Sequence, residues 1–419
     1  MRIRLVGAAC CVLWFAIACS GEDGGAPDAD NDDAAEAADG SGDDALPDAR
    51  DADGNGDAET DAPPGDAADV EAEADALAVP RFSFVVIGDS QFATTSCTSG
   101  VSERTAIPEV IRELSPHFVL EAGDLMDHGY DAGAYDQFES CNAAFISAMP
   151  FFPTMGNHDA GSGGILAYKA YLERRLFAAN AAAWPGDYAS DFTQWYEDDP
   201  NTYSTDFGAP THRDIVPSGV SFETFYAFRY RNAYFVSLEV GTRYWSNTPT
   251  TWLDQHLAEA QADPTIDHVF VMLHHPIYST TMLDDSTGEC TGPVRDAYAS
   301  YFHDRDVTMV FSGHAHVYDR FWVPDDGHRT ADAPPSTYPH DGNSVHYVVT
   351  GGAGGPLPSC SPMPSAAGVV GWDYSQARFC GYHVTHVDVD GPRLVVRVLG
   401  VEGSAASHTT TEWETFTIE

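Results

Sequence analysis

Residues 82–127 read FSFVVIGDSQFATTSCTSGVSERTAIPEVIRELSPHFVLEAGDLMD, and the fold class can be argued outward from them. An apolar run at 82–87 and a second at 117–122 both lead into Gly-Asp, and the intervening segment 103–114 reads as a helix. Short apolar runs joined by a helix are typical of neighbouring strands in an α/β sheet. The stretch therefore predicts a strand, a helix and a second strand, with an acidic residue where each strand ends.

The same alternation continues along the chain. Helices are predicted at 132–149, 252–262 and 295–304, and strands at 151–155, 268–273 and 307–311. A hairpin is predicted around Arg231 and Asn232, and four more strands at 346–350, 382–389, 393–401 and 411–418. Residues 160–222 are rich in aromatics, Asp and Pro and read as an irregular insertion over the site. Two packed sheets flanked by helices fit this order.

The N-terminal segment 1–19 resembles a bacterial export signal. Two arginines precede a short apolar run at 5–18, which is too short for a membrane span, and small residues lead to Cys19. A cysteine at the cleavage point indicates a lipoprotein, anchored through a lipid on Cys19 at the periplasmic or outer surface. Ala16 departs from the Leu usual three residues earlier, so an ordinary secretory signal is the alternative.

Residues 20–80 and 81–419 differ in composition. The first segment contains 21 acidic residues, one basic residue and almost no residues able to form a core, which predicts a disordered acidic tether. The segment 81–419 is long enough for one catalytic domain with a large core. It is also acidic and has no basic patch, which argues against a nucleic acid partner.

Five cysteines fall in the predicted domain, an odd number that leaves one free or paired between molecules. Export favours disulfides. On spacing we favour a bond between Cys360 and Cys380. No CxxC motif is present, which argues against a thiolate zinc site.

Five short polar blocks occur in the chain, four of them directly after a predicted strand. Ligands bind at this edge of open α/β sheets, and the carboxylates, amide and imidazoles of the blocks suit hard or borderline metal ions. Each block alone is a weak signal, but their order and placement together predict a metal centre. The blocks are Gly88–Gln91, Gly123–Asp127, Gly156–Asp159, His274–Pro276 and Gly313–His316.

With these motifs the chain resembles the calcineurin-like metallophosphoesterases, whose blocks read D-x-H, GD, GNH-D/E, H-x-P and GH-x-H. The sequence GHAHVYDR at 313–320 is similar to the purple acid phosphatase signature GH-x-H-x-Y-E-R, and residues 225–238 and 347–355 also resemble that branch. The resemblance covers about residues 81–402. It implies an α/β fold, a four-layer α/β/β/α sandwich of two mixed β-sheets flanked by helices.

The resemblance also implies roles for the residues of the blocks. Two divalent or trivalent ions (Fe, Mn or Zn) would share the site, with Asp124 bridging them. The first ion would be held by Asp89 and His316, and the second by Asn157, His274 and His314. Gln91 stands where the family commonly has His, and we expect it to ligate through its weaker amide oxygen.

Asp127 stands where the purple enzymes have an iron-binding Tyr, so we expect no purple colour. In the serine/threonine phosphatase branch, an Asp at this position orients the His of GNH. We therefore expect Asp127 to orient His158 as the general acid. His128 could bind the phosphate of the substrate or could only line the pocket. His275 could contact the substrate or could only pack against its neighbours.

The function implied is hydrolysis of phosphate monoesters by a metal-bridging hydroxide, with a phosphoester as the partner molecule. A phosphodiesterase, acting on a cyclic nucleotide or a phospholipid head group, would use the same metal core. A non-catalytic surface lipoprotein that keeps the fold for binding is an alternative of another class. Turnover of a phosphomonoester against that of the matching diester separates these readings.

Overall fold

A computed structural model describes residues 81–92, 96–98, 100–129, 132–160, 164–173, 192–197, 225–239, 250–281, 291–326, 334–358 and 372–419. The predicted signal segment 1–19 and tether 20–80 lie outside these residues. Within the described part of the chain, no helix combines the length and the apolar character needed to cross a membrane.

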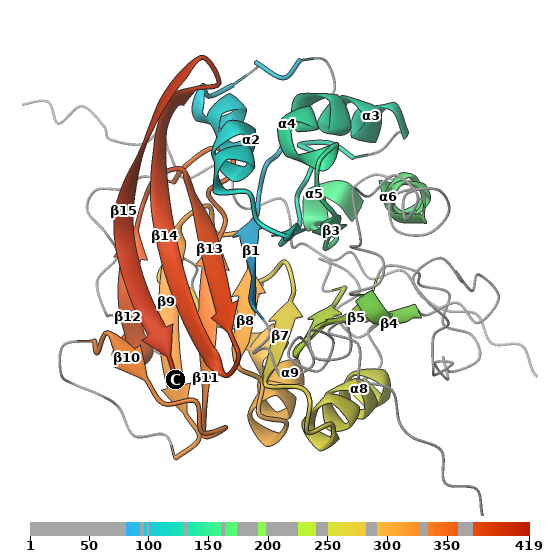
Figure 1. Cartoon of the computed structure of the whole chain (residues 1–419). Coiled ribbons are helices and arrows are strands. Elements are labelled where there is room, and N and C mark those ends of the chain that lie inside the picture. Colours follow the sequence, from blue (N-terminus) through green and yellow to red (C-terminus); the bar gives the residue numbers. More distant parts are fainter. Residues whose placement is uncertain are drawn as a thin grey trace, which may run out of the picture. The chain divides into compact units, whose positions relative to one another are not determined.

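The first sheet has seven strands in the order β10-β15-β14-β13-β1-β2-β3 (Figure 1). Its β1, β2 and β3 are parallel, whereas β13 pairs antiparallel with β1 and with β14, so the sheet is mixed. Its strands are β1 (Arg81–Ile87), β2 (Phe118–Glu121), β3 (Phe151–Pro153), β10 (Thr337–Tyr338), β13 (His383–Asp390), β14 (Arg393–Ser404) and β15 (Ser407–Ile418).

The second sheet has eight strands in the order β12-β9-β11-β8-β7-β6-β5-β4. The strands β6, β7, β8 and β11 run parallel, and the outer strands pair antiparallel. The strands are β4 (Phe192–Glu197), β5 (Tyr226–Tyr230), β6 (Ala233–Ser237), β7 (His268–Met272), β8 (Met309–Ser312), β9 (Tyr318–Pro324), β11 (Ser344–Thr350) and β12 (Ser375–Phe379).

The two sheets pack face to face through an aromatic core. The Phe84 ring of β1 lies 5.4 Å from Phe235 and 5.1 Å from Phe270, both on the second sheet. Such edge-to-face contacts add to the stabilisation from buried area. A second apolar cluster joins the other face of the second sheet to two helices, with Val271 on the sheet, Leu257 on one helix and Phe302 on the other.

Helices cover the outer face of each sheet (Figure 1). The helix α2 contacts β14 and β15 of the first sheet, and α9 contacts β11 of the second. The four-layer α/β/β/α arrangement of two mixed sheets is therefore confirmed. The helices are α2 (Glu103–Leu114), α3 (Ala132–Cys141), α4 (Ala143–Ile146), α5 (Asn157–Ala160), α6 (Gly164–Glu173), α8 (Thr250–Ala262) and α9 (Thr291–Asp304), with a 3-10 turn η3 (Trp372–Tyr374).

Parts of the secondary-structure prediction were wrong. The helix predicted at 132–149 is broken at Asn142, whose φ of −102° is not helical, so α3 and α4 are separate helices. The segment 160–222, expected to be irregular, contains α6 and β4. Strands β9, β10 and β12 were not predicted at all.

The described residues contain a disulfide between Cys97 and Cys141, which spacing did not indicate. It ties the loop after β1 to the end of α3. Cys380 is also disulfide-bonded. The predicted pairing of Cys380 with Cys360 stays a prediction, because Cys360 lies outside the described residues.

Candidate metal centre

The five polar blocks follow β1, β2, β3, β7 and β8, and the loops that carry them meet between the two sheets. The Asp89 N–H donates to the Gly123 carbonyl (2.9 Å), and the Gly313 N–H donates to the His274 carbonyl (3.0 Å). Because parallel strands end at a common edge, loops far apart in sequence become neighbours there. All seven predicted ligands are thereby brought together.

The backbone at this edge is strained. Eight non-glycine residues of the described chain have positive φ, a conformation that costs energy for residues with a Cβ. Five of the eight are predicted metal ligands: Asp89, Gln91, Asp124, His314 and His316. Such strain persists where the surrounding structure enforces it, and its concentration here marks the edge as a functional candidate on grounds independent of motif matching.

Three predicted ligands form what we term the first half-site: Asp89, Gln91 and His316. The His316 Nε2 lies 3.2 Å from Asp89 Oδ1, and the Gln91 side-chain amide lies 3.2 Å from the same His316 nitrogen. The other Asp89 oxygen accepts the His314 backbone N–H at 2.7 Å. Apart from its ion-pair contact with His316, the buried Asp89 Oδ1 accepts no hydrogen bond among the described residues, which leaves it available to a cation.

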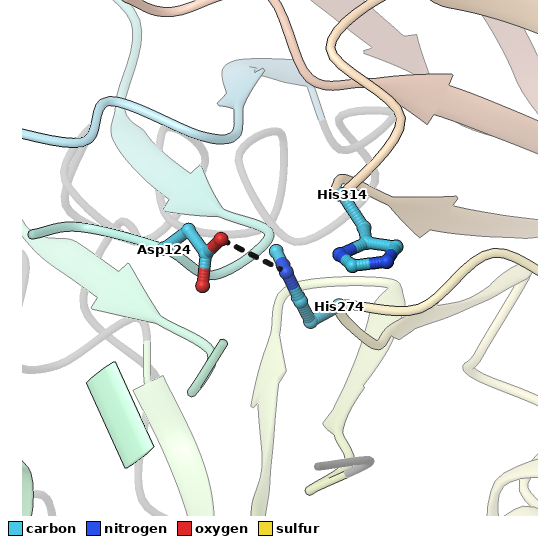
Figure 2. Close-up of side chains that lie close together, drawn as sticks. All are labelled: Asp124, His274 and His314. Atoms are coloured by element: carbon cyan, nitrogen blue, oxygen red, sulfur yellow. Dashed lines mark ion pairs between the residues drawn. The ribbon is translucent and has the colours of Figure 1, made fainter. Parts of the chain in front are cut away.

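The second half-site consists of Asn157, His274 and His314. The Asn157 Oδ1 lies 2.9 Å from His274 Nε2, while His274 Nδ1 donates to the Ala122 carbonyl at 2.8 Å. That second bond fixes the imidazole so that Nε2 faces the site. Figure 2 shows Asp124, His274 and His314 turned toward one another, and one donor atom from each lies within 4.8 Å of the others.

Asp124 lies between the two half-sites. Its Oδ2 is 3.2 Å from the Gln91 amide nitrogen on one side and 3.3 Å from His274 Nε2 on the other. The residue is fully buried. This placement is the one that a carboxylate shared by two ions requires, although the role itself stays a prediction.

Asp159 holds the Asp124 loop in place, a role that we did not predict. Its Oδ2 accepts the backbone N–H groups of Asp124 (2.9 Å), Gly156 (3.0 Å) and Leu125 (3.3 Å). Burial and the nearby Asp124 charge raise the pKa of Asp159 to about 7, against the lowering effect of the backbone donors. The signal was present in the sequence, because Asp159 ends the block Gly156–Asp159.

The donor set fits metal ions. Burial alone would lower the pKa of His274, but the adjacent Asp124 carboxylate outweighs burial and raises it to about 9. Burial likewise opposes the effect of Asp89 on His316, whose pKa also rises to about 9. The site therefore stabilises positive charge between carboxylates and imidazoles. Carboxylate, amide and imidazole donors are those that Mn, Fe and Zn accept.

His158 lies beside the centre with its ring partly exposed. Its Nδ1 donates to the backbone carbonyl of Asp127 at 2.7 Å, while the Asp127 carboxylate is 3.6 Å away. His158 Nε2 therefore points toward Asp124, whose Oδ2 lies at 3.9 Å. Asp127 contacts His158 as expected, but the backbone and not the side chain makes the hydrogen bond. His128 is more exposed and lies 3.1 Å from the Asp127 carboxylate.

His275 is almost fully buried, and its ring packs against His314 with 4.3 Å between centroids. This position behind a predicted ligand favours the packing alternative over substrate contact. A separate cavity of about 270 Å³, lined by residues including Asp267, Thr308 and His346, lies where β7, β8 and β11 begin. It is at the other end of these strands and contributes no residue to the metal centre.

Comparison with known proteins agrees with this geometry. The family model for calcineurin-like phosphoesterases matches residues 82–318, which include all five blocks. Purple acid phosphatase 22 of Arabidopsis thaliana is 32% identical over 202 residues, 48% of this chain and 38% of the relative. Phosphoenolpyruvate phosphatase of Allium cepa is 28% identical over 106 residues, 25% of this chain and 21% of the relative. The chain thus spans well under two thirds of these relatives.

Solved structures share the fold. A purple acid phosphatase from yellow lupin (Lupinus luteus) seeds superposes with a TM-score of 0.54 at 15% identity, over 81% of this chain and 54% of that one. PhoD superposes with a TM-score of 0.51 at 10% identity, over 81% of this chain and 70% of that one. Because the family match spans more than half of the chain and contains every block of the site, the protein belongs to the calcineurin-like phosphoesterase family.

Proposed function

We propose that the protein is a metal-dependent phosphoesterase that hydrolyses phosphate monoesters. The observation that carries the proposal is the placement of Asp124 between the two half-sites, with the His158 ring 3.9 Å from its carboxylate. A shared carboxylate and an adjacent proton donor are the two protein groups that phosphoester hydrolysis at paired metal ions needs.

The residues that would hold two ions are those of the half-sites. Asp89, Gln91 and His316 would hold one, Asn157, His274 and His314 the other, and Asp124 both. When bound, the ions supply Lewis-acid activation of water and neutralise charge on the phosphoryl group. This local positive charge also offsets the acidity of the domain, which would otherwise repel an anionic substrate.

His158 would provide the proton for the leaving group. Its Nδ1 is committed to the Asp127 carbonyl, so Nε2 is the nitrogen that can transfer a proton to the departing oxygen. The side chain is 36% exposed, so a substrate can reach it from solvent. The buried rings of the site, such as His274, have no such access.

The test compares hydrolysis of p-nitrophenyl phosphate and bis(p-nitrophenyl) phosphate by protein loaded with Mn²⁺, Zn²⁺ or Fe. We expect the monoester to be turned over with the higher kcat/KM. A clear preference for the diester would replace the proposal with a phosphodiesterase. Metal-loaded protein that hydrolyses neither ester would favour the non-catalytic binding alternative.

We further propose that the chain is exported and anchored through a lipid on Cys19. The Cys97–Cys141 disulfide supports export, because such bonds persist in oxidising compartments. Metabolic labelling with a radioactive fatty acid tests the anchor. Label should be incorporated by the wild-type chain and lost in Cys19→Ala, and equal labelling of both would contradict the anchor.

A further inference from the structure

A glycine-rich segment lies directly against the residues of the first half-site. Residues 351–355, here called the glycine loop, follow β11 and are buried without regular secondary structure. The Gly355 N–H donates to the Asp89 carbonyl at 2.7 Å, and the Ala353 N–H donates to that of Gly88 at 2.9 Å. The next residue, Pro356, accepts a hydrogen bond from His316 Nδ1 at 2.6 Å.

The glycine loop lies close against the predicted ligands of the first half-site. A Cβ at Gly355 would lie 2.7 Å from His316 Cε1 and 3.0 Å from Gln91 Oε1, distances that leave no space for a side chain. With its hydrogen bond to Asp89, this loop therefore contacts every member of the first half-site. Any shift of the loop would be transmitted to these residues, because packed interiors do not absorb displacement freely.

Arg104 holds the glycine loop from the opposite side. It lies on α2 with 6% of its surface exposed, and its Nη2 donates to the Gly354 carbonyl at 2.7 Å. The guanidinium lies over the Phe92 ring, 5.4 Å from its centre, in a favourable cation–π contact. Gly354 has a φ of +152°, and a Cβ there would lie 2.8 Å from Arg104 Nε, so only glycine allows this approach.

A buried arginine is costly, and its position needs a reason. Burial lowers the pKa of Arg104, an effect that the charge of Asp127 partly offsets. Taking a charge out of water costs free energy, so the burial of Arg104 does not by itself indicate that this residue stabilises the fold. The guanidinium nonetheless offers a strong, geometrically rigid donor, and here that donor acts on a loop that contacts the whole first half-site.

We propose that Arg104 is a positioning residue: through the glycine loop, it keeps Asp89, Gln91 and His316 in the arrangement that binds a metal ion. The inference rests on the proposed metal centre. If Arg104 has this role, the two half-sites depend on it differently, because the second half-site is oriented by other bonds, such as that from His274 to the Ala122 carbonyl. Loss of Arg104 should therefore weaken the binding of the ion in the first half-site and leave the binding of the other ion unchanged.

The test is calorimetric titration of metal-free protein with MnCl₂, comparing Arg104→Met with Arg112→Met. Arg112 is the matched control, because it lies on the same helix with half of its side chain exposed. We expect Arg104→Met to bind one equivalent about 10-fold more weakly, the lower end of the effect of losing a residue that supports a metal ligand, and the other equivalent unchanged. Arg112→Met should match the wild type.

Arg104→Lys keeps the charge and a donor, and keeps the test decisive if Arg104→Met does not fold. It should weaken the same equivalent by a smaller factor. The inference is overturned if the folded Arg104 variants bind both equivalents as the wild type does, or lose both equally. Wild-type protein that binds Mn²⁺ but hydrolyses no ester would overturn the proposed function while leaving the role of Arg104 intact.

Discussion

Replacing Asp159 with Asn measures how strongly the protein holds the Asp124 loop. The Asp159 Oδ2 accepts three backbone N–H groups, and Oδ1 accepts the Met126 N–H (3.4 Å) and the Tyr135 hydroxyl (3.2 Å). The amide of Asn keeps most bonds if its oxygen takes the Oδ2 position. Its NH₂ then faces the Met126 N–H, while the hydroxyl of Tyr135 can turn and accept.

One buried backbone N–H is thus left without an acceptor, and such a loss costs about 1–3 kcal/mol. We expect Asp159→Asn to lower the free energy of unfolding by this amount in urea at pH 8. That pH lies above the pKa of about 7, so the wild-type carboxyl is ionised. The control is Asp390→Asn, an exposed carboxylate paired with Arg81, which should cost about 0–1 kcal/mol. Equal losses of unfolding free energy in the two variants would show that Asp159 does not hold the Asp124 loop.

Three further predictions concern the acid, the pH dependence and the disulfide. His158→Ala should lower turnover about 10²–10⁴-fold for an alkyl phosphate and far less for p-nitrophenyl phosphate, whose leaving group needs no proton. Asp127→Asn should lower turnover by less than about fivefold, because the Asp127 backbone carbonyl still fixes the His158 ring and an exposed ion pair contributes about 1 kcal/mol at most. Equal losses of turnover in His158→Ala and Asp127→Asn would contradict this expectation. Burial, with His340 nearby, lowers the pKa of His268 to about 3, so below pH 6.5 the unfolded chain binds the extra proton and stability falls as the pH drops. Between pH 7 and pH 5 the wild type should lose about 2 kcal/mol of unfolding free energy through His268, and His268→Gln should remove this part of the loss. Urea unfolding at both pH values measures it, and an unchanged loss in the variant would contradict the lowered pKa of His268. Replacing Cys97 and Cys141 together with Ala should cost about 2–4 kcal/mol, as expected for a bond between residues 44 apart, and an unchanged urea midpoint would contradict it.

The sequence predicted the fold class because its signals are local. An apolar run ending at Gly-Asp, as at Ile87 and Ala122, marks both a buried strand and the edge where it stops. Strand β9 was not predicted, because it carries the charged residues Asp319 and Arg320, which argue against a buried strand. In the structure, Arg320 Nη2 donates to Glu414 Oε1 at 2.5 Å, and this partner is 94 residues away, so no local pattern reveals it.

In the candidate site, likewise, some residues were predicted from the sequence and others were not. The seven predicted ligands were assigned through the resemblance that the motifs carry, and the structure brings these residues together. The parts that hold them in place were missed, because they depend on loop conformation. Asp159 acts through backbone N–H groups, and Arg104 acts through the carbonyl of Gly354. Asp159 stood within a recognised block, but its backbone partners could not be read from the sequence, and the contact of Arg104 leaves no pattern in the spacing of residues. The pairing of Cys97 with Cys141 was missed for a similar reason, since connectivity is not encoded in spacing.

We propose that the residues around Asp124 form a metal centre that hydrolyses phosphoesters. The most direct test titrates metal-free protein with Mn²⁺ while following p-nitrophenyl phosphate hydrolysis and bound metal in the same samples. We predict that hydrolysis is absent without metal, rises as metal binds, and is lost in Asp124→Asn. Hydrolysis that is independent of bound metal, or full metal binding without hydrolysis of this ester, would contradict the claim.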